Sequence, residues 1–239
     1  MLRCGMLLLL SSLALAAPRD LRPRYGTGWA GFTKGTWVTM KITSVMPKRV
    51  PSVQTQTTRL TEASKTTLKL ERVTKNPLTD DRTQSWSVPA SGEAQVGEKA
   101  VVKQLPDEKV RAAGKQWDCT KREMTFTSKT GKRMVTEWVA KSPLLQIKRI
   151  ERSFDAAGKQ QSIRSVILLK LPFRQRVSGR ELECVTYRSL LKQGKIENRE
   201  DSVQSRDIPG GFVSLDLKQY RGGKLAVTIE MKALRFGVK

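Results

Sequence analysis

The chain of 239 residues contains no histidine, only three cysteines and 6% aromatic residues. Histidine is the commonest general base and the commonest transition-metal ligand in proteins. A cysteine nucleophile also needs a nearby base, which is usually histidine. No Ser-x-x-Lys motif stands at the start of a credible helix, so a serine nucleophile with a lysine base is disfavoured too. We therefore expect no enzyme activity, no catalytic residues, no cofactor and no metal site.

Long apolar runs are also lacking, except at the N-terminus. Arg3 precedes an unbroken apolar run over residues 6–10, and residues 14–16 read Ala-Leu-Ala, the small-x-small pattern of a cleavage site. We predict a signal peptide over residues 1–16, cleaved near Ala16, and export to the periplasm or the cell exterior; a buried N-terminal helix is the alternative. Residues 166–171 form the best later apolar stretch, which is strand-sized, so we expect no transmembrane span.

Acidic residues are scarce: 22 Asp and Glu face 45 Lys and Arg, which gives a net charge of +23. Such a charge favours polyanions as partners, namely acidic polysaccharide, anionic lipid headgroups or nucleic acid. The basic residues are scattered without a run of four, and aromatic residues are not interleaved with them. We expect no nucleic-acid partner, because such sites usually show clustering or stacking aromatics. Lipid, another polyanion and a merely solvated surface stay open.

Period-two alternation is the dominant pattern that is present. Residues 37–45 and 225–233 alternate apolar with polar side chains, as antiparallel strands with one buried face do. Glycine-containing turn signals recur between such segments. We predict an all-β fold, an antiparallel curved sheet that forms either an open barrel or a two-layer sandwich. The expected strands are 36–46, 53–61, 66–73, 82–88, 116–127, 133–140, 145–154, 161–171, 181–191, 196–203, 211–220 and 225–234, and residues 106–113 suggest one short turn of helix.

The second half of the chain echoes its middle. Residues 113–119 and 178–184 both read small-Gly-basic-polar-apolar-acid-Cys, and a Pro-containing turn and a Gly-Lys pair follow each at nearly constant offset. Coincidence among common turn residues is the alternative. We predict a tandem β-unit repeat, with an N-terminal β region over 17–103, copy one over 104–171 and copy two over 172–239, in one or two compact domains.

Cys119 and Cys184 occupy equivalent positions in the two copies. Trp117 and Leu182 share their parity, so all four side chains are expected to face the core. A disulfide could persist in an exported protein and would stabilise it by about 3–4 kcal/mol. Equivalent positions in one sheet lie several strands apart, beyond the ~7 Å Cα limit, whereas face-to-face units would bring them together. A disulfide and two buried thiols both stay open.

Two segments carry a family resemblance. Residues 29–38, which read WAGFTKGTWV, and the block 179–184 followed by 208–213 resemble uncharacterised exported bacterial β-proteins. These are similar to the periplasmic lipoprotein-carrier fold, in which an open half-barrel holds acyl chains. Copy one departs from the pattern, with Leu144-Leu145 where copy two has Gly210-Gly211. The resemblance implies a binding protein for an apolar or amphipathic ligand, and it brings no catalytic or ligand-binding residues with it.

Adjacent carboxylates and an aromatic cluster are the remaining candidate site residues. Paired carboxylates could serve a glycosidase, but we interpret these as solvated turns or ion-pair partners. The aromatic residues are expected to pack in the core, or else to line a ligand rim. The pairs are Asp80-Asp81, Asp107-Glu108 and Glu200-Asp201, and the aromatic residues are Trp29, Phe32 and Trp37. We predict an exported, non-enzymatic binding protein of unknown ligand; the alternative is a cationic envelope-associated protein that binds polyanions.

Overall fold

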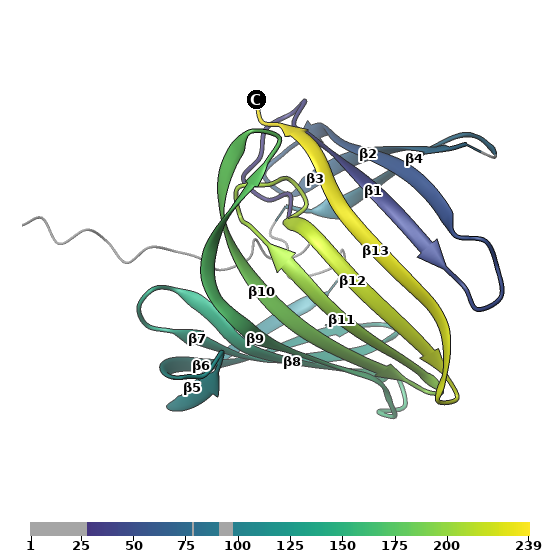
Figure 1. Ribbon diagram of the computed structural model, residues 1–239. Coiled ribbons are helices and arrows are strands. Elements are labelled where there is room, and N and C mark those ends of the chain that lie inside the picture. The colour runs from purple at the N-terminus through teal and green to yellow at the C-terminus, as the bar shows by residue number, and fades with distance from the viewer. Residues whose placement is uncertain (1–27, 78, 91–97) are drawn as a thin grey trace, which may run out of the picture.

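The structure, a computed structural model, describes residues 28–77, 79–90 and 98–239. The predicted signal peptide lies outside these residues. The described residues form strands and turns and contain no helix, so the all-β prediction is confirmed (Figure 1). The strands are β1 (Trp37–Val45), β2 (Ser52–Ala63), β3 (Thr67–Asn76), β4 (Thr79–Pro89), β5 (Lys99–Ala112), β6 (Lys115–Ser128), β7 (Gly131–Ala140), β8 (Leu145–Asp155), β9 (Gln160–Val177), β10 (Arg180–Gln193), β11 (Ile196–Gln204), β12 (Phe212–Arg221) and β13 (Lys224–Gly237).

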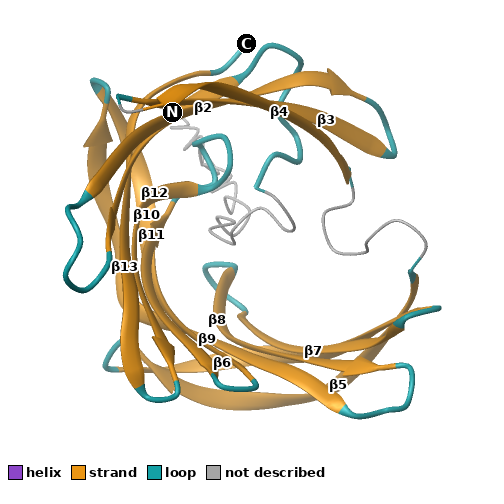
Figure 2. Ribbon diagram, turned by 90° about the vertical axis from the view of Figure 1, so that its right-hand side faces the viewer, coloured by secondary structure: helices purple, strands orange, loops and turns teal. Residues whose placement is uncertain are grey.

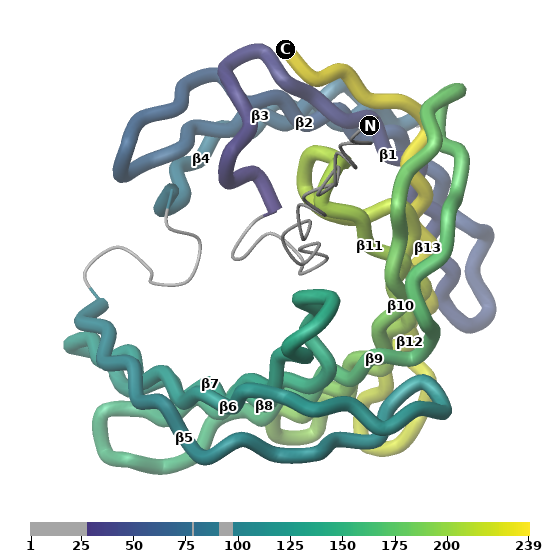
Figure 3. The backbone as a smooth tube through the Cα atoms, turned by 90° about the vertical axis from the view of Figure 1, so that its left-hand side faces the viewer, coloured from purple at the N-terminus to yellow at the C-terminus, as the bar shows by residue number. Residues whose placement is uncertain are grey.

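All the strands belong to one antiparallel sheet with the order β4-β3-β2-β1-β13-β12-β11-β10-β9-β8-β7-β6-β5. Neighbours in the sheet are consecutive in the sequence, except that β1 pairs with β13. Strands β4 and β5 are therefore the two edges, although one follows the other along the chain. Figures 2 and 3 show the sheet curled around an interior, with β4 and β5 on either side of its opening. The open curved sheet is confirmed, and the two-layer sandwich alternative is wrong.

The turn at residues 113–114 in copy one and the turn at residues 178–179 in copy two have the same backbone conformation. Ala113 and Gly114 have φ angles of 51° and 73°, and Ser178 and Gly179 have φ angles of 50° and 80°. Two successive positive φ angles are typical of a two-residue type I′ hairpin, which matches the twist of the flanking strands. The agreement supports our proposal that residues 104–171 and 172–239 are copies of one unit.

The helical turn expected over residues 106–113 is wrong, because this segment belongs to β5. Its Pro106 lies where the β5–β6 register shifts, between Leu105 and Glu108. A proline cannot donate a ladder hydrogen bond, and it is tolerated at bulges and on edge strands. Since β5 is an edge strand, Pro106 disturbs the sequence pattern without ending the strand.

Three buried apolar clusters stabilise the sheet. The largest combines side chains of β1, β2, β3, β9, β10, β12 and β13 with the loops before β1 and after β11. A second gathers β5 to β10, and a small third one lies between β6 and β7. Trp117, Cys119, Leu182 and Cys184 are all at most 5% exposed, which confirms that these positions face the core. The pairing of β1 with β13 thus brings the first and last strands of the sheet into one core.

Cys119 and Cys184 are free thiols that lie in different clusters. Burial away from water disfavours the thiolate and raises the pKa of each to about 11, from an ordinary value of 9.0. We expect both thiols to resist alkylation at pH 8 and to react fully after unfolding in guanidinium, as counted by peptide mass spectrometry. If a reductant alone made the cysteines of the folded protein reactive, the two would instead be joined in a disulfide.

The raised pKa values also predict a pH dependence of stability. Below pH 9.0 both thiols are protonated in the folded and the unfolded state, so their full contribution to the free energy of unfolding is present. Between pH 9.0 and about 11 the unfolded chain releases protons that the folded protein retains, so the free energy of unfolding falls as the pH rises. Urea denaturation at pH 8 and pH 10.5 measures this loss, and the Cys119→Ala/Cys184→Ala variant should lose less over the same interval.

Candidate functional site

The inner face of the curled sheet can be traced through direct cross-strand partners, because opposite residues in an antiparallel ladder point to the same face. The inner face contains the buried face of β1. Its side chains belong to the same buried cluster as the loop before β1, which lies inside the curl (Figure 3). One row of partners runs through Ile42, Met231, Leu215, Ser202, Tyr187 and Leu168. The next row runs through Ile229, Leu217, Glu200, Ser189, Val166, Arg149, Glu137 and Arg122.

Two loops form an inner plug at one end of this face: residues 28–36 before β1 and residues 205–211 between β11 and β12. The backbone amide of Gly210 donates a hydrogen bond to the carbonyl of Gly28 at 3.2 Å. A Cβ atom on Gly28, whose φ is +73°, would lie 2.5 Å from the carbonyl carbon of Gly210, so only glycine permits this contact. Ile208 is fully buried in the same cluster as Trp29. The plug fills the apolar interior where its two loops meet.

Beside the plug, the inner face remains apolar but only partly buried. Ile229 and Met231 of β13 and Trp86 and Val88 of β4 pack against the buried cluster and keep part of their surface exposed. Trp86 lies opposite the buried Leu70, which places it on the inner face. These side chains offer apolar surface to a molecule inside the curl.

The β6–β8 wing of the inner face is different, because arginines and glutamates are paired with one another there. Glu137 is fully buried and accepts hydrogen bonds from Arg122, with Nη2 at 2.6 Å and Nε at 2.8 Å. Arg149 lies 3.9 Å from Glu137 and 3.7 Å from Glu151, and Glu151 also lies 3.7 Å from Arg133. Pairing offsets the desolvation of these charges. This wing is a polar wall whose charges already compensate each other.

Arg72 on β3 is an inner-face cation in a different setting. Its guanidinium carbon lies 4.8 Å from the centre of the Trp86 ring, and its cross-strand partner is Gln84. Its Nε atom is buried, and within the described residues that atom has no hydrogen-bond partner. A hollow of about 470 Å³ is lined by Arg72, Gln84, Ser85 and Trp86. The guanidinium thus borders the hollow beside the Trp86 ring.

The adjacent carboxylates singled out in the sequence do not form a catalytic pair, because neighbours on a strand point to opposite faces. Glu200 faces inward, with its Oε2 3.4 Å from Arg164, whereas Asp201 faces outward and pairs with Arg188 at 2.8 Å. The others also contact cations: Asp107 contacts Lys141, Glu108 contacts Lys121, and Asp81 contacts Lys75. Their interpretation as ion-pair partners is confirmed for these residues.

The aromatic residues near β1 divide between the two faces. Trp29 and Phe32 are 4% and 8% exposed and contact each other edge to face, so they are core residues and not a ligand rim. Trp37 lies half-buried on the outer face, where the guanidinium of Arg235 stands 5.8 Å from its ring. The aromatic residue at the hollow is Trp86, which the sequence analysis did not single out.

Within the described part of the chain, no group of three or more acidic or cysteine side chains is arranged to hold a metal ion. No helix there is long and apolar enough to cross a membrane.

The fold is weakly similar to three solved structures. One is named as an outer membrane lipoprotein-sorting protein domain from Vibrio parahaemolyticus (10% identity, 89% of this chain and 88% of that one, TM-score 0.39). The others are a LolA superfamily protein from Nitrosomonas europaea (8%, 87% and 87%, 0.35) and an exported protein with a YmcC-like fold from Bacteroides fragilis (9%, 87% and 98%, 0.34). No family model matches the chain, and no curated protein shows significant similarity. The resemblance to the lipoprotein-carrier fold is confirmed as a weak one, and such a likeness does not identify a ligand.

Proposed function

We propose that this is an exported, non-enzymatic protein that binds an amphipathic molecule carrying an anionic group on the inner face of its sheet. The observation that carries the proposal is the guanidinium of Arg72, which lacks a carboxylate partner among the described residues and borders a hollow beside Trp86. Binding sites typically combine apolar walls with a few polar groups that fix orientation. The anionic group would contact Arg72, and the apolar part would lie against Trp86 and Val88.

The ion pairs of the β6–β8 wing support the same placement of the ligand, with its anionic group at Arg72. Arg122, Arg133 and Arg149 contact Glu137 or Glu151, so an anion gains less there than at Arg72. An arginine without a carboxylate can form two parallel hydrogen bonds to a phosphate or carboxylate, which is the strong geometry for this pair. The ligand class that fits is therefore a chain or ring system with one phosphate or carboxylate.

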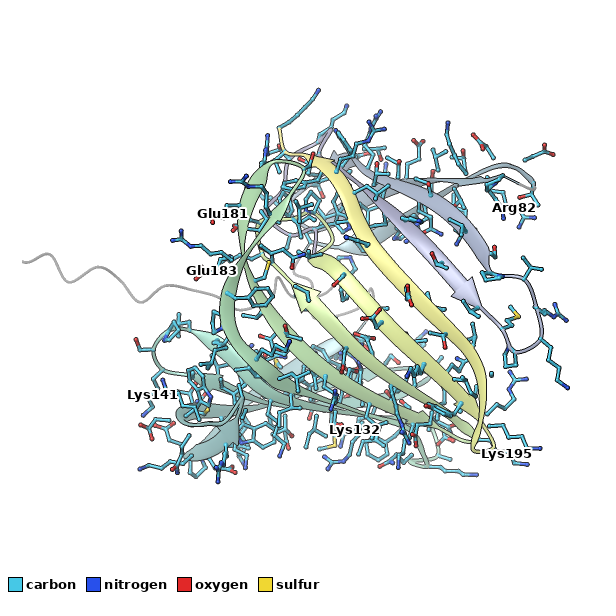
Figure 4. All side chains as sticks on the ribbon, in the orientation of Figure 1. Arg82, Lys132, Lys141, Glu181, Glu183 and Lys195 are labelled. Atoms are coloured by element: carbon cyan, nitrogen blue, oxygen red, sulfur yellow. The ribbon has the colours of Figure 1, made fainter. Side chains whose placement is uncertain are left out.

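Calorimetric titration with dodecyl phosphate tests this function. We expect Arg72→Gln to weaken binding of dodecyl phosphate at least tenfold, which corresponds to about 1.4 kcal/mol. Binding of the neutral dodecanol should stay within about twofold, because its apolar contacts are unchanged. Arg82→Gln is the matched control: Arg82 lies on the same face of the same hairpin, opposite Thr74 and outside the hollow (labelled in Figure 4).

Three results would contradict the proposal at different points. Equal binding of dodecyl phosphate by the Arg72 and Arg82 variants would remove Arg72 from the site. Binding of inorganic phosphate alone with the same dependence on Arg72 would define a site for a free anion. No binding of dodecyl phosphate or dodecanol by the unaltered protein would remove the amphipathic ligand altogether.

A further inference from the structure

The strand directions show which strands end on the same side of the sheet. All neighbouring strands are antiparallel, so β1, β3, β6, β8, β10 and β12 all end on the same side of the sheet. Figure 2 looks onto this end, which is opposite the inner plug. The inner face therefore has one plugged end and one end bordered by hairpin turns.

Five of the turns at this end, those after β1, β6, β8, β10 and β12, carry exposed cations, whereas Asp80 and Asp81 follow β3 and Asp155 ends β8. The exposed cations of these five turns, which we call the cationic rim, are Lys48, Arg49, Lys129, Lys132, Lys159, Lys195, Arg221 and Lys224. Within the described residues, none of these side chains makes an ion pair; the pairs near this end involve Lys75, Lys192 and Arg199 instead. In Figure 4, the labelled Lys195 lies far from Lys141, Glu181 and Glu183 at the plugged end.

The plugged end has cations too, and carboxylates accompany some of them. Lys141 lies 2.6 Å from Asp107, Arg174 lies 3.1 Å from Glu181, and Lys69 lies 2.6 Å from Glu62. Other exposed cations near the plugged end, among them Lys34, Lys65 and Arg111, also make no ion pair within the described residues, so unpaired positive charge lies at both ends of the sheet. Several unpaired cations on one side of a molecule attract an anionic surface with a strength that falls as salt screens them.

Exposed apolar side chains lie among these cations. Val50 is 90% exposed and Met46 is 46% exposed in the β1–β2 turn, on either side of Lys48 and Arg49, and Leu225 is 43% exposed next to Lys224. An acidic polysaccharide offers nothing for such side chains to bury in. An anionic bilayer attracts the cations at its headgroups and accepts apolar side chains at the acyl boundary.

We infer that the cationic rim docks on an anionic lipid membrane, with the β1–β2 turn inserted at the interface. The inference does not depend on the ligand proposed for the hollow, because no rim residue lines it. Docking in this way would hold the open end of the inner face towards the bilayer.

Vesicle co-sedimentation of the purified protein tests this. We expect binding to vesicles of phosphatidylcholine with phosphatidylglycerol, weak binding to phosphatidylcholine alone, and a steep loss of binding between about 50 and 300 mM NaCl. Each cation near such a surface contributes about fivefold in partitioning, so Lys195→Gln/Arg221→Gln/Lys224→Gln should reduce it at least tenfold. Met46→Ser/Val50→Ser should remove most of the binding that survives high salt.

The matched control removes the same charge from the other end. Lys34→Gln/Lys65→Gln/Arg111→Gln replaces three exposed cations near the plugged end and should change the partitioning by no more than about twofold. Equal losses in the rim and control variants would overturn the inference, because they would show that only net charge matters. Salt-sensitive binding to heparin without binding to phosphatidylglycerol vesicles would also overturn it and would favour an acidic polysaccharide.

Discussion

Replacing Ile208 with alanine is expected to lower the free energy of unfolding by about 3 kcal/mol. Ile208 is 0% exposed, and the loop that carries it meets the loop before β1 through the Gly28–Gly210 hydrogen bond. The substitution removes buried methylene groups and leaves a cavity that two loops tied to each other cannot easily collapse to fill. Urea denaturation followed by tryptophan fluorescence measures the change.

The matched control for this prediction is Ile167→Ala. Ile167 lies on β9 and is 37% exposed, so the same change of side chain should cost about 0.5 kcal/mol or less. If both variants lost the same stability, Ile208 would not be a packed element of the core. A loss confined to Ile208→Ala would show that the inner plug is part of the cooperative fold.

The second large effect is expected at Glu137, whose replacement by alanine should cost about 3 kcal/mol. Glu137 is fully buried, and Arg122 and Arg149 converge on its carboxylate with side chains that are 29% and 17% exposed. Removing the carboxylate leaves two largely desolvated guanidinium groups without this partner, which costs more than the pair itself contributes. Glu137→Gln, which keeps an oxygen acceptor, should lose less.

The outer-face pair of Arg188 and Asp201 is the control for Glu137. It has the same cross-strand arrangement, with two hydrogen bonds of 2.8 Å, but its side chains are 58% and 40% exposed. Asp201→Ala should therefore cost no more than about 1 kcal/mol, because water solvates the groups in either state. Equal losses at the two positions, measured by urea denaturation, would show that the inner face is as wet as the outer one.

The strands were largely predictable from local patterns. Strand β13 and strand β1 alternate apolar and polar side chains, and the turns at Gly114 and Gly179 need the positive φ angles that glycine adopts readily. Strand β5 was not predictable, because Pro106 and its charged neighbours obscure the alternation of an edge strand that has only one partner.

The site was much less predictable than the strands. Charged side chains usually face water, yet Arg149 and Glu151 both lie on the inner face. A charged residue on a buried face reveals itself only through its partners, which come from strands distant in the sequence. Arg72 carried no signal at all, since its significance lies in the absence of a carboxylate opposite it.

The amino-acid sequence by itself determined the strands, most of the turns and the excess of positive charge, because each depends on residues that are close neighbours along the chain. The tertiary structure decided that β1 pairs with β13, that the sheet stays open between β4 and β5, and which charges meet a partner. It also brought cations from five separate turns to the same end of the sheet, since an antiparallel meander returns every second turn to the same side. Those outcomes depend on cross-strand register and curvature, which local pattern does not encode.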